Sequence, residues 1–204
     1  MSAGAKDCCV AFLPIYIYDH PILRRRAKPA RKPDEQLVTL ANDMVETMRN
    51  ACGIGLAANQ VGSLHRMIVI DAAEAGENKS APPLILINPE IVKEDGLVTM
   101  EEGCLSIPDL RENVERAERI AVRFRDLEFK EQEIDTDGLL ARVILHEFDH
   151  LNGVLFFDHL NIVRRKLLRG RLNKIRNGES TVTYPAIGAI EVPRDPNAPR
   201  ILND

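Results

Sequence analysis

The spacing of apolar residues along the chain predicts three helices. Apolar side chains recur every three or four positions, most regularly in the first helix, as expected for a helix with one buried face. The three segments are residues 34–51, 138–152 and 160–176. Asp34 and Asp137 stand where a side chain can cap the first turn of the first two helices. Gly170 is expected to break or weaken the third helix, because glycine is a poor helix former.

Short apolar runs between the first two helices predict strands. They lie at residues 66–71, 84–92, 118–126 and 129–135. The segment 74–83 is rich in turn residues and is expected to be a loop. Strands with helices interspersed indicate an α+β domain, in which the 138–152 helix packs against sheet.

The two ends of the chain differ from this middle part. The apolar run at residues 8–18 contains Pro14 and is not followed by a small-residue cleavage site, so it predicts an N-terminal strand rather than a signal peptide. The tail from residue 178 onward carries four prolines, which predicts an extended or partly disordered extension.

Length and composition restrict the class of protein further. A chain of 204 residues favours one domain with a sizeable core. The net charge of −4 gives no overall attraction to nucleic acid, so no DNA partner is expected. No apolar run approaches the roughly 20 residues of a membrane helix, so no membrane partner is expected. Four cysteines, two of them adjacent, do not make a disulfide framework and indicate a reducing, cytoplasmic setting.

The first stretch with candidate chemistry is HEFDH, residues 146–150. His146 and His150 are four positions apart and therefore share one face of the predicted helix. Two imidazoles placed in this way can both bind one ion, at about 2.0–2.1 Å. Glu147 flanks such an ion, where a general base belongs. The alternative is an ordinary helix with satisfied histidines and surface acids, but the full H-E-x-x-H pattern favours the metal site.

A catalytic metal site of this kind typically has a third protein ligand. The candidates are His20, His65, His159, the acidic residues and Cys104. Cys104 lies between Gly103 and Pro108, which indicates a loop or the end of a strand. A thiolate there suits iron, cobalt, nickel or zinc. A small buried cysteine without chemistry fits the same pattern equally well.

The third stretch is GIGLAANQ, residues 53–60. Its glycines and small residues directly follow a helix and predict a tight turn. The side-chain amide of Gln60 can donate a hydrogen bond to a carbonyl oxygen or an oxyanion. Taken alone, this stretch favours a turn without further function.

Taken together and in this order, GIGLAANQ, EGCLS and HEFDH resemble the three signature motifs of the peptide deformylases. The resemblance extends over residues 13–176. It implies an α+β fold of the deformylase type, with antiparallel sheets packed around a central metal-binding helix and a further C-terminal helix. The implied organisation is a single catalytic domain at 1–177 and an extension at 178–204.

The resemblance also implies a reaction and the residues that carry it. The metal ligands would be Cys104, His146 and His150, holding one divalent ion per chain, usually Fe²⁺, with Zn²⁺, Ni²⁺ or Co²⁺ as alternatives. The catalytic groups would be Glu147, which moves the proton, and Gln60 and the backbone N–H of Leu105, which hold the oxyanion. The substrate-binding residues would be Gly53, Ile54, Gly55, Gly103 and Arg111. The enzyme would remove the formyl group from the formyl-methionine of nascent proteins and release formate.

Some residues depart from the family's common pattern, and other readings stay open. Leu145, Arg142 and Asp109 are such departures, and Arg142 is expected near the substrate pocket. A metallopeptidase would share the H-E-x-x-H pattern, although the common ones take Glu or His as third ligand. A non-catalytic metal-binding or ribosome-associated protein on the same fold is the remaining possibility.

Residues 161–177 carry seven arginines and lysines and no acid. The simplest interpretation of this helix is a solvated face. Bacterial members of the family dock on the ribosome near the peptide exit through a C-terminal helix. The resemblance therefore implies a weak, salt-sensitive contact between residues 161–177 and the ribosome.

Overall fold

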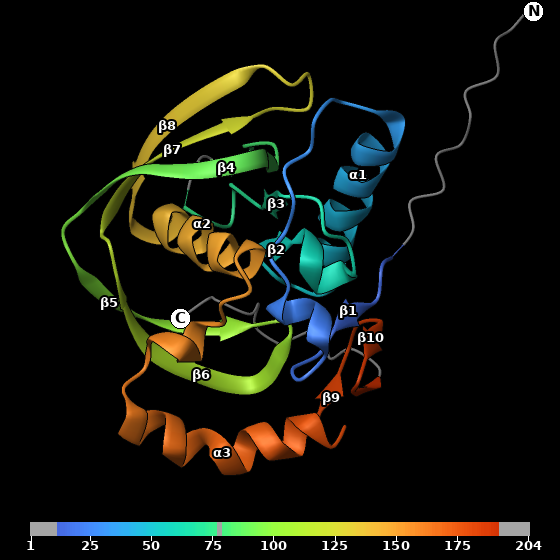
Figure 1. Ribbon diagram of the computed structural model, residues 1–204, viewed down its shortest axis with the longest axis vertical. Coiled ribbons are helices and arrows are strands. Elements are labelled where there is room, and N and C mark those ends of the chain that lie inside the picture. The colour runs from blue at the N-terminus through green and yellow to red at the C-terminus, as the bar shows by residue number, and fades with distance from the viewer. Residues whose placement is uncertain (1–11, 77–78, 192–204) are drawn as a thin grey trace, which may run out of the picture.

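Helix α2 (Gly138–Leu151) runs through the middle of the molecule, with β-sheet on two sides of it (Figure 1). The computed structural model describes residues 12–76 and 79–191. The main sheet is antiparallel, with the strand order β2-β3-β4-β7-β8. These strands are β2 (Gly55–Ala57), β3 (Met67–Ile70), β4 (Leu84–Asp95), β7 (Arg119–Arg125) and β8 (Glu131–Asp137). The second sheet is the antiparallel hairpin of β5 (Val98–Cys104) and β6 (Ile107–Arg116). The predicted α+β class, with antiparallel sheets around a central helix, is confirmed.

The remaining elements lie around these two sheets. The helices are α1 (Glu35–Asn50), α3 (Ile162–Arg176) and the short 3₁₀ helices η1 (Pro21–Arg24), η2 (Ala58–Val61) and η3 (Phe156–His159). Two pairs of short parallel strands are β1 (Ile15–Tyr16) with β10 (Ala186–Ile187), and β9 (Thr181–Val182) with β11 (Ile190–Glu191). Within the described residues, no helix combines the length and apolar character needed to cross a membrane.

The two main helices begin in different ways. Asp34 caps α1 as predicted, because its Oδ1 accepts a hydrogen bond from the Leu37 N–H at 2.8 Å. Asp137 stands at the corresponding position of α2 but makes no capping hydrogen bond, and it pairs with Arg119 at 3.0 Å instead. The predicted cap of α2 is therefore wrong. Gly138 takes the left-handed conformation with φ of 59°, which lets β8 pass directly into α2.

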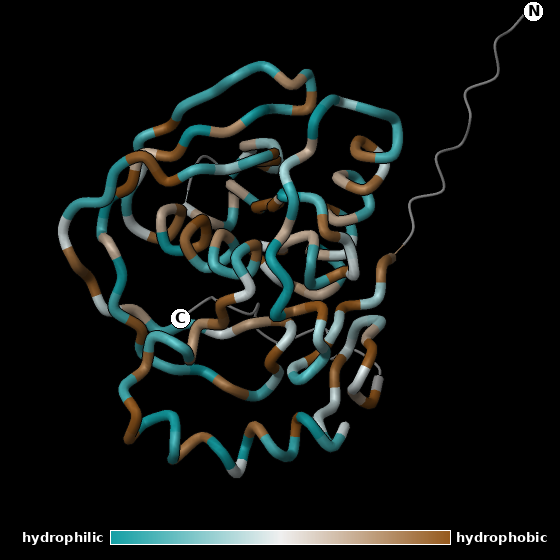
Figure 2. The backbone as a smooth tube through the Cα atoms, viewed as in Figure 1, coloured by the Kyte–Doolittle hydropathy of each residue, from teal (hydrophilic) through white to brown (hydrophobic). Residues whose placement is uncertain are grey.

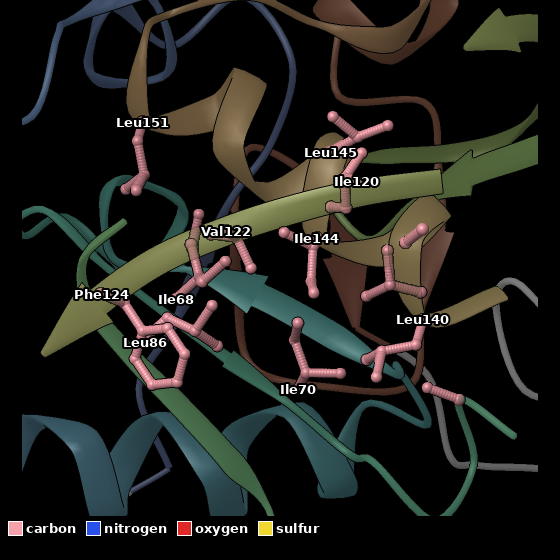
Figure 3. Close-up of a cluster of buried hydrophobic side chains, with 14 of the residues drawn as sticks. Ile68, Ile70, Leu86, Ile120, Val122, Phe124, Leu140, Ile144, Leu145 and Leu151 are labelled. Atoms are coloured by element: carbon pink, nitrogen blue, oxygen red, sulfur yellow. The ribbon is translucent and has the colours of Figure 1, made fainter. Parts of the chain in front are cut away.

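Helix α2 packs its apolar side chains against the main sheet (Figure 3). The cluster includes Leu140, Ile144, Leu145 and Leu151 of α2 and Ile68, Ile70, Leu86, Ile120, Val122 and Phe124 of the sheet. In Figure 2, apolar positions dominate α2, whereas much of the β7–β8 hairpin is hydrophilic. Because α2 is surrounded by this core, several of its polar side chains are also buried, and the packing around them fixes their positions.

Three segments differ from what the apolar pattern predicts. Residues 53–60 are not a simple turn, because β2 pairs with β3 and η2 follows it. Residues 98–116, where no strand is predicted beyond the possible strand end at Cys104, form the β5–β6 hairpin. Helix α3 continues through Gly170 without a break.

The tail begins as extended backbone that returns to the body of the protein. Strands β9, β10 and β11 lie within residues 181–191, and Val182 and Tyr184 are buried. Residues 1–11 and 192–204, which include the start of the apolar N-terminal run and three of the tail prolines, lie outside the described residues. The boundary placed at residue 177 stays a prediction.

Candidate metal centre

Three predicted metal ligands converge beside α2. The ligand atoms of Cys104, His146 and His150 all lie within 4.8 Å of one another, and the three residues are buried. Cys104 Sγ is 3.1 Å from His150 Nε2. The two histidines reach this point because they lie one helical turn apart, and Cys104 reaches it because β5 ends there.

The ligand cysteine sits at an irregular point of the hairpin. The β5–β6 register shifts between Gly103 and Cys104, so that Cys104 pairs with Ile107. The residues between them, Leu105 and Ser106, form a turn whose backbone is turned away from the regular ladder. The cysteine is therefore at a strand end, as predicted.

Glu102, which is fully buried, is the shared acceptor behind the ligands. Its Oε2 is 2.8 Å from His146 Nδ1, and its two oxygens accept from Arg116 Nε at 2.6 Å and Nη2 at 3.1 Å. Arg142 Nη1 donates to Oε1 at 2.8 Å. Burial alone would raise the pKa of Glu102, but His146 and then Arg116 hold it well below its usual range. Glu102 is thus an anion that fixes His146 with Nδ1 as donor, leaving Nε2 for a metal.

The same network extends to the outer end of the site. Arg116 Nη1 donates to Asp149 at 2.6 Å, and His159 Nε2 lies 2.6 Å from the same carboxylate oxygen. His159 is therefore a partner of Asp149 and lies outside the ligand set. Arg142 is buried and donates to the carbonyl oxygens of Val98 and Val114, so its expected place near the substrate pocket is not supported by any contact.

The electrostatics of the ligands suit a cation. Burial would lower the pKa of His146, but its contacts with Cys104 and Glu102 raise it well above the usual value. Burial and the neighbouring His146 lower the pKa of His150 well below its usual value, so His150 is neutral and can bind through a nitrogen lone pair. The thiol and Glu102 thus favour positive charge at His146, whereas His150 offers a neutral nitrogen.

Glu147 lies beside the ligands with one oxygen free. It is buried, and the described residues offer no hydrogen-bond partner to its Oε2. Burial raises the pKa of Glu147 to about 7. Gly55 makes room for it: a Cβ there would lie 2.6 Å from Glu147 Oε1 and 2.7 Å from Val143 Cγ1. The second glycine of GIGLAANQ is thus required by the close approach of a carboxylate.

Gln60 faces the ligands from η2. Its Oε1 accepts from the Ala57 N–H at 2.7 Å, which fixes the orientation of the amide. Its Nε2 donates to Ser106 Oγ at 3.2 Å and lies 3.6 Å from Cys104 Sγ. A neutral donor is therefore held within reach of any atom that binds beside the sulfur.

These residues fit a catalytic metal ion. Two imidazoles and a thiolate are a tetrahedral donor set with one position left open. A cavity of about 10 Å³, roughly the space for one water, adjoins them. Its lining is Gly53, Ile54, Gly55, Gln60, Gly103, Cys104, Leu105, His146 and Glu147. A larger groove of about 530 Å³ also reaches Gly103 and Cys104 and is lined by Arg111. All predicted site residues therefore line the cavity or the groove, except His150, whose ligand nitrogen lies within 4.8 Å of the ligand atoms of Cys104 and His146.

The sequence did not reveal the groups that support the ligands. Glu102 and Arg116 are buried on the β5–β6 hairpin, and Tyr184 comes from the tail. One signal was available: Glu102 directly precedes the Gly-Cys pair, and an acid beside a candidate ligand is a candidate to orient a histidine. The tail tyrosine carried no such signal.

A helix that supplies two histidines and a buried glutamate to a three-ligand centre defines a metallohydrolase. Residues 12–166 match the polypeptide deformylase family. The chain is 50% identical to the peptide deformylase of Salinibacter ruber over 183 residues, which cover 86% of this chain and 94% of that protein. The chain therefore belongs to the peptide deformylase family. It is a metal-dependent hydrolase that removes the N-formyl group from the formyl-methionine of newly made proteins and releases formate.

Solved structures agree with this assignment. The crystal structure of a peptide deformylase from Legionella pneumophila is similar with a TM-score of 0.74 and 43% identity, covering 80% of this chain and 95% of that one. A peptide deformylase from Synechococcus elongatus, in complex with actinonin, is similar with a TM-score of 0.71 and 40% identity, covering 88% and 92% of the two chains. The metallopeptidase and non-catalytic alternatives are set aside by these matches.

Proposed function

We propose that Cys104, His146 and His150 hold the ion of this deformylase and that Glu147 moves the proton of the reaction. The observation that carries the proposal is the buried Oε2 of Glu147, which has no hydrogen-bond partner among the described residues and lies beside three converging candidate ligands. When bound, a divalent ion polarises the formyl oxygen and lowers the pKa of a coordinated water toward about 7. Membership of the family makes Fe²⁺ our proposal for the native ion, and a site with one thiolate would also accept Zn²⁺, Ni²⁺ or Co²⁺.

Glu147 takes the proton of the attacking water and delivers it to the methionine nitrogen as the carbon–nitrogen bond breaks. A carboxyl group with a pKa of about 7 can both accept and donate a proton near neutral pH. Gln60 Nε2 and the Leu105 N–H donate to the oxyanion that forms on the formyl oxygen. Gln60 Nε2 is near this place already, because it donates to Ser106 Oγ at 3.2 Å and to Cys104 Sγ at 3.6 Å.

Small residues define the room for the substrate. In the proposed complex, Gly55 and Gly103 lie along the peptide, Ile54 helps to form the wall of the methionine pocket, and Gly53 lines the cavity beside the ligands. Arg111 lies in the larger groove, where it can meet the residues after methionine. Formyl is the smallest acyl group, and the cavity beside the ligands has about the room of one water. We therefore expect no hydrolysis of acetylated peptides.

The proposal is tested by formate release from a formyl-methionyl tripeptide with protein purified without oxygen. Glu147→Gln should lower kcat by about 10²–10⁴-fold, the usual contribution of a general base, while the metal content stays at the wild-type level. Glu133→Gln, on the exposed surface of β8, is the matched control and should leave kcat unchanged. Full activity of Glu147→Gln would overturn the assigned role. The metal content of the same protein identifies the native ion.

The surface of α3 supports a proposal for the ribosome. Ile162, Val163 and Leu167 are exposed on α3, and Arg165, Lys166 and Arg169 line a groove of about 490 Å³ beside it. Exposed apolar and basic side chains on one helix are suited to an RNA or protein surface of negative charge. We therefore place a salt-sensitive ribosome contact on residues 161–177, in the cytoplasm, where nascent chains are made.

This contact is tested by ribosome co-sedimentation at low salt. Reversal of Arg165, Lys166 and Arg169 to Glu should weaken binding, whereas Arg164 is left in place because its Nε donates to Glu112 at 2.7 Å. The matched control reverses the exposed Lys28, Arg31 and Lys32 outside α3. Equal binding of the two variants would remove α3 as the docking site.

A further inference from the structure

The chain returns to the active site after α3. Strand β10 lies beside β1 in parallel, with Ile15 paired to Ala186, and the Ile15 N–H donates to the Pro185 carbonyl oxygen at 2.9 Å (Figure 1). This pairing fixes the backbone directly after Tyr184. The segment at 181–184 also forms part of the wall of the groove that reaches Cys104.

Tyr184 joins this segment to the catalytic turn. Its hydroxyl donates to the carbonyl oxygen of Leu105 at 2.7 Å, and the side chain is buried. Tyr184, Val182 and Leu105 belong to one apolar cluster, so the ring is held by packing as well as by the hydrogen bond. Burial raises the pKa of Tyr184 further above its usual value, so the hydroxyl stays protonated and remains a donor.

The turn that follows Cys104 depends on such contacts. The β5–β6 ladder shifts there, so regular strand pairing does not fix Leu105 and Ser106. Ser106 is held by the Tyr18 N–H, which donates to its carbonyl oxygen at 2.7 Å, and by Gln60, which donates to its hydroxyl. At Leu105 the carbonyl oxygen accepts from Tyr184. The side-chain donor that anchors Leu105 is therefore supplied by the tail.

We propose that Tyr184 is a positioning residue for deformylation: its hydroxyl anchors the Leu105 carbonyl and thereby restrains the backbone of Leu105, whose N–H is the proposed oxyanion donor. The inference rests on the role proposed above for Leu105. Under this proposal, a residue that follows α3 in the chain contributes to catalysis. A donor aimed at developing charge acts through its fixed position, so loss of the anchor should weaken catalysis more than substrate binding.

The test is Tyr184→Phe, which keeps the ring and removes only the hydroxyl. We expect kcat for the formyl-methionyl tripeptide to fall about tenfold, less than the roughly 10²–10³ typical for loss of a whole oxyanion donor, with KM within about twofold of wild type. Tyr16→Phe removes a phenolic hydroxyl outside the catalytic turn and should leave kcat unchanged. Tyr184→Met provides a second, differently shaped variant without the hydroxyl and should show the same loss in kcat.

Two further readouts separate positioning from other effects. Metal content and the absorption spectrum of Co²⁺-loaded Tyr184→Phe should match wild type, because the ligands themselves are unchanged. An unchanged kcat, a loss confined to KM, or an altered Co²⁺ spectrum would each overturn the proposal. Glu147→Gln is measured alongside: if it also retains full activity, the fault lies in the assigned catalytic roles, and if it is inactive while Tyr184→Phe is not, only the positioning role fails.

Discussion

At the scale of single residues, the site is organised by one carboxylate. Glu102 serves His146, Arg116 and Arg142 at once, with no exposure to solvent. The guanidinium groups of Arg116 and Arg142 offset the negative charges of Glu102 and Asp149. The ligand histidine is therefore oriented by a group that is itself held from two sides.

Glu102→Gln should lower metal affinity about 10–100-fold. The neutral amide is a weaker acceptor for the His146 N–H, and Arg116 and Arg142 lose the negative charge of Glu102. Affinity is measured by competition between the protein and a chelator for Zn²⁺. Glu115→Gln, an exposed acid of the same hairpin, is the control and should bind Zn²⁺ as wild type does. Equal affinity of the two variants would show that Glu102 does not tune the ligand.

Gly55→Ala should lower kcat, because Gly55 lies against Glu147. The added Cβ would overlap Glu147 Oε1 and the side chain of Val143, both on α2, so the carboxylate must move. A displacement of about 1 Å at a reacting group can lower the rate about 10²-fold. Formate release measures the loss, and Gly170→Ala, where an added Cβ meets nothing within 4 Å, is the matched control. Wild-type kcat in Gly55→Ala would refute the close approach.

At the scale of elements, the periodicity of hydrophobic residues predicts the helices far better than it predicts the β5–β6 hairpin. Helix α1 keeps its polar face in water, so its apolar stripe is visible in the sequence. The β5–β6 hairpin buries Glu102, Glu112 and Arg116, and these charged residues hide the alternation of a strand. Glu102 and Arg116 pair with each other across the hairpin, and their further partners and that of Glu112 come from α2 and α3, which local reasoning does not see.

Helix α3 offers a pair of glycines with opposite roles. Gly170 is exposed inside the helix, whereas Gly178 follows its end with φ of 72°. At that end the N–H groups of Gly178 and Glu179 donate to the carbonyl oxygens of Ile175 and Lys174, as in a Schellman motif.

Gly170→Ala should raise the free energy of unfolding by about 0.5–1 kcal/mol, because alanine has the better helix propensity. Gly178→Ala should lower it, by about 1 kcal/mol or more, because alanine is strained in the left-handed conformation. Urea unfolding measures both. A change of the same sign in the two variants would contradict this account of the helix and its end.

At the scale of the whole molecule, the site is assembled from segments far apart in the chain. The motifs of η2, β5 and α2, read together as a family resemblance, predicted residues that the fold brings to one place, namely Cys104, His146 and His150 with Glu147 and Gln60 beside them. The contact of Tyr184 with Leu105 was not predictable, because an ordinary tyrosine in a proline-containing tail reaches Leu105 through the pairing of β1 with β10 and through packing with Val182. Contacts between segments as far apart in sequence as β1 and β10 depend on tertiary structure, and no local sequence pattern predicts them.

The metal centre also links two layers of the fold, and this predicts its effect on stability. Cys104 belongs to the β5–β6 hairpin, whereas His146 and His150 belong to α2, which packs on the main sheet. An ion bound to all three binds the folded chain far better than the unfolded one, and at about 1,000 times its Kd it adds roughly 4 kcal/mol. Because Glu102 and its arginines remain in place without the ion, removal should weaken the fold without abolishing it.

Chelation under reducing conditions should therefore lower the unfolding midpoint by about 8–16 °C, from roughly 2–4 °C per kcal/mol for a chain of this size. Scanning calorimetry of the loaded and the chelated protein measures the shift. Cys104→Ala is the control: with one ligand missing, its midpoint should respond much less to the chelator. If the wild-type and Cys104→Ala midpoints respond equally, the ion does not join the hairpin to α2, and its stabilising effect must come from a site without the thiolate.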